Sequence, residues 1–132
     1  MEGKYSLITE KIIGAFYVVY NALGCGFLEK VYENALCIEL KNRGICFTQQ
    51  HPIKVYYLNQ EVGIYCADLF VEETIIVELK AAENLCAAHE AQLLNYLRAT
   101  EIECGLLLNF GKTPQIKRKL WNKEKGPENP VF

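Results

Sequence analysis

The segments Gly63-Ile-Tyr-Cys-Ala-Asp-Leu-Phe-Val71 and Thr74-Ile-Ile-Val-Glu-Leu-Lys80 decide the fold that this sequence predicts. Each segment is short and largely apolar, as strands are, and the two glutamates between them suit a turn. Apolar residues occupy both sets of alternate positions, which is typical of a sheet covered on both faces. The stretch therefore predicts a hairpin that is buried between other layers of the molecule.

The register of this hairpin brings its charged residues together. With a three-residue loop, Val71 faces Ile75, and antiparallel pairing then places Asp68 opposite Glu78, with Cβ atoms about 5 Å apart. Lys80 lies two residues further on and therefore on the same face as Glu78. A slip of one residue would separate the two carboxylates onto opposite faces.

Two carboxylates beside an ammonium are costly inside an apolar sheet unless they meet a partner. Asp68 is also the only aspartate among the 16 acidic residues. Because hard divalent cations prefer carboxylate oxygens, we interpret Asp68, Glu78 and Lys80 as a candidate divalent-metal site with a catalytic lysine. The alternative is a solvated strand face, on which Glu and Lys at this spacing are common.

Length and composition limit the class of protein. The 132 residues suffice for one domain with a real core, expected over 7–121, followed by a tail over 122–132. No apolar stretch approaches the roughly 20 residues of a membrane span, and no secretory signal is evident, so we expect a cytoplasmic protein without membrane contact. The net charge of −2 gives no global attraction for nucleic acid. The six cysteines lack metal-site spacing and are expected to be reduced, buried thiols: Cys25, Cys37, Cys46, Cys66, Cys86 and Cys104.

The hydrophobic periodicity predicts an α/β order of elements. Helical spacing covers residues 7–23 and 28–43, and a period of two follows over 45–49, 53–58, 62–71 and 75–79. A helix over about 87–100 and a buried strand over Cys104–Phe110 complete a crossover, which predicts parallel pairing with the strand that ends near Lys80. A short basic helix is expected over Gln115–Trp121. The expected architecture is a mixed sheet flanked by helices.

Two helical patterns accompany the candidate site. Glu29 and Glu33 lie four residues apart on one side of a helix, where they repel each other by about 0.2–0.5 kcal/mol unless a cation is shared. Gln92 and Tyr96 share one face of the helix that follows Lys80, so its first turns can lie over the carboxylates. The alternatives are an exposed helix surface for the glutamates and an amphipathic boundary for Gln92 and Tyr96.

Basic residues gather late in the chain. Lys117, Arg118 and Lys119, close to Trp121 and further lysines, form the one local patch suited to phosphates. The alternative is a solvated helix face. The sequence has no glycine-rich phosphate loop, and no Ser-His-Asp arrangement fits a chain whose sole aspartate lacks a histidine at a suggestive position.

These motifs, taken in order, resemble a known superfamily. The series Asp68, Glu78-x-Lys80 and Gln92-x-x-x-Tyr96, on an αβββαβ order of elements, resembles the PD-(D/E)xK nuclease superfamily and its RecB-type branch. With Gly26-x-x-Glu29-x-x-Tyr32 the chain looks more closely like the GxxExxY family of small bacterial and archaeal proteins. Ala67 stands where the superfamily has proline.

The resemblance implies a restriction-endonuclease-like α/β fold and a metal-dependent phosphodiester hydrolase. It implies that Asp68 and Glu78 bind Mg²⁺ or Mn²⁺ and that Glu29 completes the metal shell. Lys80 would orient or deprotonate the attacking water, or stabilise the pentavalent phosphate. Gln92 and Tyr96 would position the metal or the phosphate.

The expected partner is nucleic acid, either DNA or RNA, bound through Lys117, Arg118 and Lys119. Because the chain has little basic surface, a homodimer or a partner subunit is a further expectation. The alternative function is a non-catalytic nuclease-like module that binds nucleic acid or a protein partner.

Overall fold

The computed structural model describes residues 3–123 and the backbone of 126–127. Most of the predicted tail over 122–132 therefore lies outside the described residues. The elements, in chain order, are α1 (Ser6–Leu23), α2 (Glu29–Asn42), β1 (Phe47–Tyr57), β2 (Gln60–Val71), β3 (Ile75–Lys80), α3 (Ala87–Ala99), β4 (Cys104–Phe110), β5 (Pro114–Asn122) and β6 (Gly126–Pro127).

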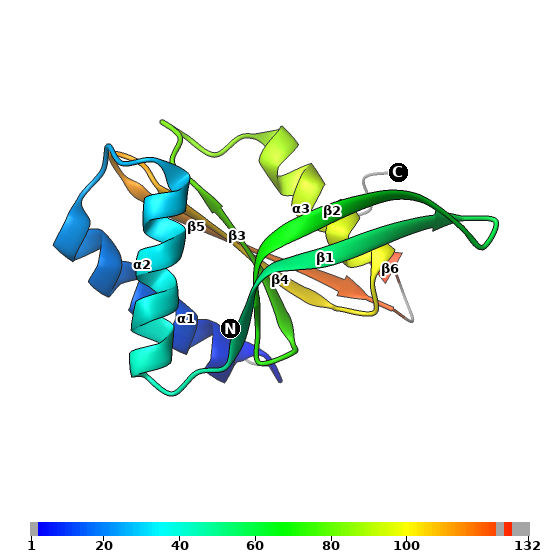
Figure 1. Ribbon diagram of the computed structural model, residues 1–132, viewed down its shortest axis with the longest axis horizontal. Helices are drawn as coiled ribbons and strands as arrows, with labels where there is room; N and C mark the ends of the chain where they lie inside the picture. Colours follow the sequence, from blue (N-terminus) through cyan, green and yellow to red (C-terminus); the bar gives the residue numbers. More distant parts are fainter. Residues whose placement is uncertain (1–2, 124–125, 128–132) are drawn as a thin grey trace.

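The strands form one mixed sheet in the order β1-β2-β3-β4-β5-β6. Neighbouring strands are antiparallel except for β3 and β4, which are parallel, with Ile75 opposite Cys104 and Lys80 opposite Asn109. The parallel pair is the crossover that the sequence predicts, because α3 connects the two strands. The predicted α/β class, a mixed sheet flanked by helices, is confirmed (Figure 1).

Helices cover both faces of the sheet, so alternate residues of the central strands enter different cores. Leu106 and Leu108 of β4 belong to the larger core, under α1 and α2. Leu107 belongs to the smaller core, under α3. Both sets are buried, which explains why the central strands are apolar throughout.

The connection between α1 and α2 is fixed by Tyr32, which is fully buried. Its ring stacks on Phe110 at a centroid distance of 4.3 Å, and its hydroxyl donates to the Gly24 carbonyl at 2.5 Å. Gly26 has a φ of 111°, which favours glycine. In the Gly26-x-x-Glu29-x-x-Tyr32 pattern, the glycine and the tyrosine therefore stabilise the loop.

Two of the predicted elements are wrong. The segment Gln115–Trp121 is not a basic helix but part of β5, which pairs with β4. Its apolar residues Ile116 and Leu120 are four apart, a spacing that fits one face of a helix and one face of a strand equally well. The predicted strands 45–49 and 53–58 are one strand, β1, because Pro52 lies in an edge strand, where proline is tolerated.

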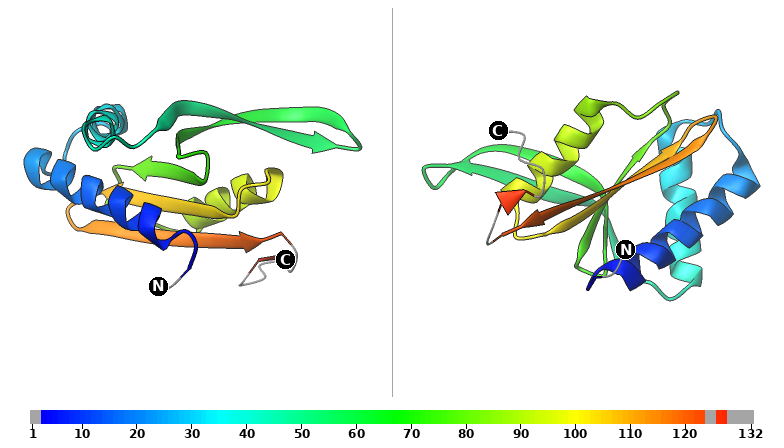
Figure 2. Two further views of the ribbon diagram at one scale, coloured as in Figure 1. Left: turned by 90° about the horizontal axis from the view of Figure 1, so that it is seen from below. Right: turned by 180° about the vertical axis from the view of Figure 1, so that it is seen from behind.

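The outer half of the β1–β2 hairpin extends beyond the body of the molecule as an arm (Figures 1 and 2). Its two-residue turn is Leu58-Asn59, and both residues have positive φ, as a type I′ turn requires. Several large apolar side chains of the arm are exposed: Tyr56, Tyr57, Leu58, Val62, Ile64 and Tyr65.

Two further expectations concern the cysteines and contact with a membrane. The cysteines are expected to be buried, but only Cys37 and Cys104 are, and the other four are exposed. Among the described helices, none combines the length and the apolar character needed to cross a bilayer.

Candidate active site

The predicted register of the β2–β3 hairpin is confirmed. Val71 pairs with Ile75 and Leu69 with Val77, so the next residues of the two strands, Asp68 and Glu78, face each other. The pairing of β2 with β3 ends at Leu69, and from there β2 continues with β1 alone. Asp68 thus lies where the sheet divides into its body and the arm.

Where β2 and β3 separate, the two carboxylates accept hydrogen bonds from backbone N–H groups of the opposite strand. The Leu79 N–H donates to Asp68 Oδ2 at 2.8 Å, and the Asp68 N–H donates to Glu78 Oε1 at 3.3 Å. Each carboxylate is therefore tied to the backbone of the opposite strand. The two acidic side chains lie together on one patch, as the hairpin argument predicts.

Glu78 is held in an environment that disfavours its charge. The residue is buried, with only 6% of its surface exposed. Burial, followed by the Asp68 charge, raises the pKa of Glu78 to about 9, although the charge of Lys80 acts in the opposite direction. A cation at this point would replace the proton and relieve the repulsion between the carboxylates.

Lys80 follows on the same strand face and is half-buried. Asn109, opposite Lys80 in the register, is fully buried and holds the loop that leaves β3. Its Oδ1 accepts from the Ala82 N–H, and its Nδ2 donates to the Ala82 carbonyl, both at 2.9 Å. This two-point contact fixes the direction in which the chain leaves Lys80.

Helix α3 packs closely on β4, and its Tyr96 lies in the same small core as Ala67 of β2 and Ile76 of β3. A Cβ atom on Gly105 would approach Leu93 Cδ1 to 2.7 Å, so a larger residue there would require the Leu93 side chain to shift. Burial and then the charge of Glu78 raise the pKa of Tyr96 to about 12. Its phenol is therefore neutral at physiological pH and able to donate a hydrogen bond.

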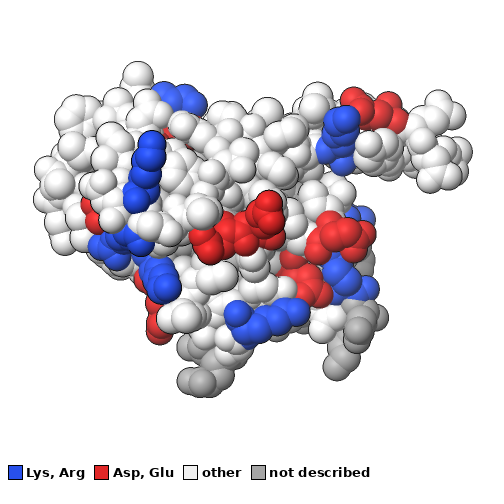
Figure 3. Space-filling view, turned by 60° about the horizontal axis from the view of Figure 1, so that its bottom comes forward, with Lys and Arg blue, Asp and Glu red and all other residues white. Residues whose placement is uncertain are grey.

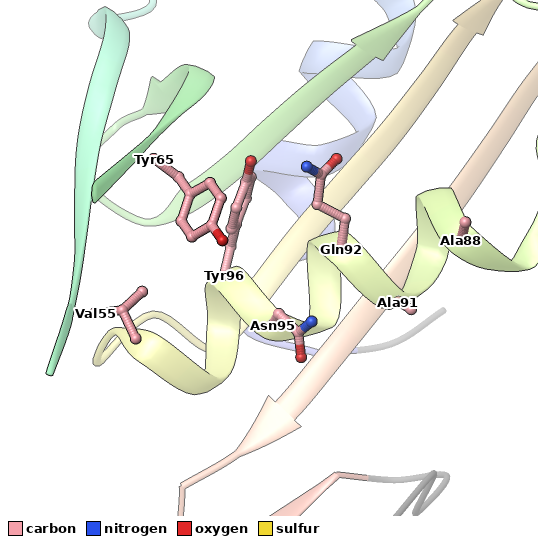
Figure 4. Close-up of a pocket in the computed structure, with 7 residues that line it drawn as sticks. All are labelled: Val55, Tyr65, Ala88, Ala91, Gln92, Asn95 and Tyr96. Carbon is pink, nitrogen blue, oxygen red and sulfur yellow. The ribbon is translucent and has the colours of Figure 1, made fainter. Parts of the chain in front are cut away.

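Gln92 and Tyr96 also line a cavity of about 360 Å³ between α3 and the arm (Figure 4). In the figure both side chains extend from α3 in the same direction, and the Tyr65 ring of β2 faces Tyr96. The face predicted for Gln92 and Tyr96 is therefore the face that borders the sheet.

A third carboxylate, Glu33 of α2, is connected to Asp68 through Gln50. Glu33 is 4% exposed, and Gln50 Nε2 donates to its two oxygens at 3.1 Å and to Asp68 Oδ1 at 3.4 Å. Gln49 and Lys30 also contact Glu33, at 2.6 and 3.0 Å. Gln50 has a φ of 56°, an unusual backbone for a non-glycine residue within a strand.

The two glutamates that the sequence pairs on α2 have different surroundings. Glu33 is buried at the sheet, whereas Glu29 is the first residue of α2 and is exposed. No described hydrogen bond or ion pair joins Glu29 to Asp68 or Glu78, so the metal-binding role of Glu29 stays a prediction. The sequence does contain a sign that Glu33 is buried. Glu33 follows Tyr32 and precedes Leu36 and Cys37, and all of these lie on the buried side of α2.

The three basic residues expected to bind nucleic acid do not form a single patch, because a strand directs alternate side chains to opposite faces. Arg118 donates to Thr9 Oγ1 of α1 at 3.3 Å, and Lys119 pairs with Glu90 of α3 at 2.6 Å. Lys117 is exposed. On the face shown in Figure 3, basic side chains lie in separate groups among acidic ones, without a continuous basic groove.

In residues 3–123, no three His, Cys, Asp or Glu side chains come together as a metal site made by protein alone. Mg²⁺ is commonly bound through one or two carboxylates plus water and substrate phosphate, and Asp68 and Glu78 could supply such a pair.

Comparison with known proteins identifies the family. Residues 6–119 match the model of the PD-(D/E)XK nuclease superfamily. The chain belongs to this superfamily. The match spans both flanking layers and the sheet through most of β5, and the α/β architecture agrees with the restriction-endonuclease-like fold of the superfamily. No curated protein matches the chain.

The chain resembles a solved structure titled "Crystal structure of SSO0001", with a TM-score of 0.51 and 18% sequence identity. The likeness covers 86% of this chain and 58% of that protein, so the chain spans little more than half of its length. At this identity the likeness concerns the fold alone.

Proposed function

We propose that this protein is a metal-dependent nuclease that hydrolyses phosphodiester bonds of DNA or RNA. The observation that carries the proposal is the meeting of Asp68 and Glu78 where β2 separates from β3, with Lys80 on the same face. Membership of a nuclease superfamily supports the same reaction class.

The residues fit Mg²⁺ or Mn²⁺. Both ions take carboxylate oxygens. Burial, followed by the Asp68 charge, raises the pKa of Glu78, and a bound cation would relieve both effects. The ion would bind between Asp68 and Glu78. When bound, it supplies charge neutralisation at phosphorus and a more acidic water.

Three side chains of the protein would act around this pair. Lys80 would hold the attacking water or the phosphate oxygens through its ammonium group. Tyr96 would donate a hydrogen bond to a phosphate oxygen, because its phenol is neutral, and Gln92 would offer an amide one helical turn away. These are the positioning and charge-stabilising roles that phosphoryl chemistry needs most.

The direct test is cleavage by purified protein with Mg²⁺ or Mn²⁺, on single-stranded and duplex DNA and RNA. We expect Asp68→Asn and Lys80→Ala to abolish cutting while the fold is retained. Glu61→Gln is the matched control, because Glu61 is an exposed carboxylate of the same strand, far along the arm. Cleavage that survives in Asp68→Asn would point to a contaminant or to another site.

A second measurement separates the metal site from the reaction. Titration calorimetry with Mn²⁺ should show weaker binding in Asp68→Asn than in the wild type. Unchanged affinity in this variant would end the proposed mechanism, whatever the cleavage assay gives.

The scattered basic residues favour one alternative, a non-catalytic module. Lys119 is paired with Glu90 and Arg118 faces α1, so neither is directed at the Asp68–Glu78 patch. A module of this kind would bind nucleic acid or a protein, would cleave nothing with any divalent cation, and would be unaffected by Asp68→Asn. If the protein is a nuclease, a second copy or a partner subunit is a candidate source of further phosphate contacts, which light scattering in the presence of substrate would reveal.

A further inference from the structure

The cavity between α3 and the arm has the character of a site for a flat, uncharged group. Its seven lining residues are Val55, Tyr65, Ala88, Ala91, Gln92, Asn95 and Tyr96, none of them charged. Its volume, about 360 Å³, falls in the lower part of the range of small-molecule sites, about 300–1,000 Å³. A phosphate would find no cation here, so the cavity suits another part of a nucleotide.

Two tyrosines give the cavity aromatic surfaces. The rings of Tyr65 and Tyr96 have centroids 5.8 Å apart and are inclined by 43°, and both are directed into the space in Figure 4. Tyr65 is 52% exposed, so its ring is available for stacking. On the helix side, Ala88 and Ala91 leave room because they have small side chains.

Polar groups at the cavity are available for an occupant. Among the described hydrogen bonds, none involves the amide of Gln92 or the hydroxyls of Tyr65 and Tyr96. Asn95 Oδ1 accepts from Arg98 Nη1 at 3.4 Å, which leaves its amide N–H groups to donate. Amides and hydroxyls that can donate or accept are the groups that read the edge of a nucleobase.

The cavity adjoins the candidate active site through shared residues. Gln92 and Tyr96 line it, and Tyr96 packs in the smaller core with Ala67, the neighbour of Asp68, and with Ile76 on the strand of Glu78. Tyr65, on the other side of the cavity, precedes Asp68 by three residues on β2. A base held in the cavity would therefore belong to a nucleotide next to the phosphate at Asp68 and Glu78.

We propose that this cavity binds an unpaired nucleobase beside the phosphate to be cleaved, so that the substrate of this protein is single-stranded nucleic acid. The inference rests on the proposed nuclease function and names its substrate class. A base within a duplex is stacked on both faces and paired at its edge, and would have to leave the helix to enter such a cavity. Stacking also gives affinity without a basic groove, which agrees with the scattered cations of this protein.

Binding, measured without cleavage, tests the inference. The Asp68→Asn protein in EDTA is titrated into a fluorescein-labelled 12-nucleotide oligo-dT, its duplex, and a series with one abasic position each, with anisotropy as the readout. We expect single-strand binding to exceed duplex binding, and one abasic position to weaken it by roughly 5- to 150-fold, the range for one lost stacked base.

Variants of the cavity locate the effect. In the same Asp68→Asn background, Tyr65→Ala should weaken binding by the same factor. Tyr65→Phe should weaken it much less, because the stacking ring is kept and only the hydroxyl is lost. Ala91→Leu should weaken it by filling the space. Tyr57→Ala is the matched control, because Tyr57 is an exposed tyrosine of the arm that does not line the cavity. Thermal melting establishes that each variant is folded.

The decisive result is non-additivity. Tyr65→Ala combined with the sensitive abasic position should cost no more than either change alone, because both remove the same contact. Full additivity, equal losses in Tyr65→Ala and Tyr57→Ala, or stronger binding of the duplex would each overturn the inference. The inference would also be overturned if thymidine monophosphate bound saturably at Tyr65 while the oligonucleotide did not bind. Since no cleavage is measured, failure of the nuclease proposal would appear separately, as inactive wild-type protein with Mg²⁺ and Mn²⁺.

Discussion

The inner and outer halves of the β1–β2 hairpin belong to one continuous ladder but have opposite surroundings. In the inner half, Leu69 and Val71 are fully buried, with β3 beside them and the α1–α2 core on one face. In the outer half, Val62 and Ile64 are exposed and β2 has only β1 as a neighbour. Asp68 lies at the boundary. The candidate site thus forms where one strand stops being shared between two partners, because its backbone polar groups can then bond to side chains.

Truncation of one apolar residue in each half of the hairpin should have very different costs. Leu69→Ala should lower the free energy of unfolding by about 2–5 kcal/mol, since it leaves a cavity in the core. Ile64→Ala should change it by no more than about 0.5 kcal/mol, because the side chain is exposed. Urea denaturation of both variants checks this. Equal costs would mean that the arm is buried in solution.

The second prediction concerns the pH dependence of stability at the boundary. Glu78 has an ordinary pKa of 4.5 and a folded-state pKa of about 9, so between these values the folded protein holds a proton that the unfolded chain releases. The contribution is fully present below about pH 4.5 and is lost as pH rises through about 9, with a slope of up to about 1.4 kcal/mol per pH unit.

Denaturation of the protein in EDTA from pH 5 to pH 9 measures this slope, and Glu78→Gln should flatten it. The matched control is Glu72→Gln, an exposed carboxylate at the inner turn, which should leave the slope unchanged. Stability that rises with pH over this interval in the wild type would contradict the environment assigned to Glu78.

The third prediction compares the two glutamates of α2. Glu33→Gln should weaken Mn²⁺ binding by about 10- to 100-fold, the usual cost of losing a group that orients a metal ligand, since Glu33 holds Gln50 against Asp68. Glu29→Gln should change the affinity less than about twofold, because Glu29 is exposed and has no described contact with the pair. Titration calorimetry with Mn²⁺ measures the affinity of each variant. The reverse order would support the role in the metal shell that the resemblance implies for Glu29.

The smallest expected effect lies at the tip of the arm. Leu58 has a φ of 50° in the two-residue turn, where asparagine is preferred, so Leu58→Asn should stabilise the arm locally by up to about 1 kcal/mol. Hydrogen exchange should slow at arm amides such as that of Ile64 and stay constant at that of Val71. Slower exchange in the inner half as well would show that the two halves open as one unit.

The sequence predicts the features that depend on neighbouring residues better than those that depend on contacts between distant segments. The register that joins Asp68 and Glu78 follows from the three-residue turn, because a hairpin loop sets its own pairing. The mixed sheet follows from the alternation of periods and from the crossover before Cys104. These are local properties of the chain, and the structure confirms them.

The remaining features depend on contacts between segments distant in sequence. β5 is a strand because β4 offers it an edge, which its own spacing of Ile116 and Leu120 does not reveal. The burial of Glu33 depends on where β1 meets α2 through Gln49 and Gln50. The left-handed backbone of Gln50 has no signal in its residue type.

The position of Pro52 has a consequence for self-association. Among the described strands, β1 is the outermost on its side of the sheet, and its free edge is a template to which another chain could add a strand. Proline has no N–H to donate to such a strand, and Pro52 divides the eleven residues of β1 near their middle. One residue thus interrupts the row of donors on the side of the arm that faces solvent. Pro52→Thr would leave the β1–β2 register intact and lengthen the uninterrupted edge, at the cost of solubility.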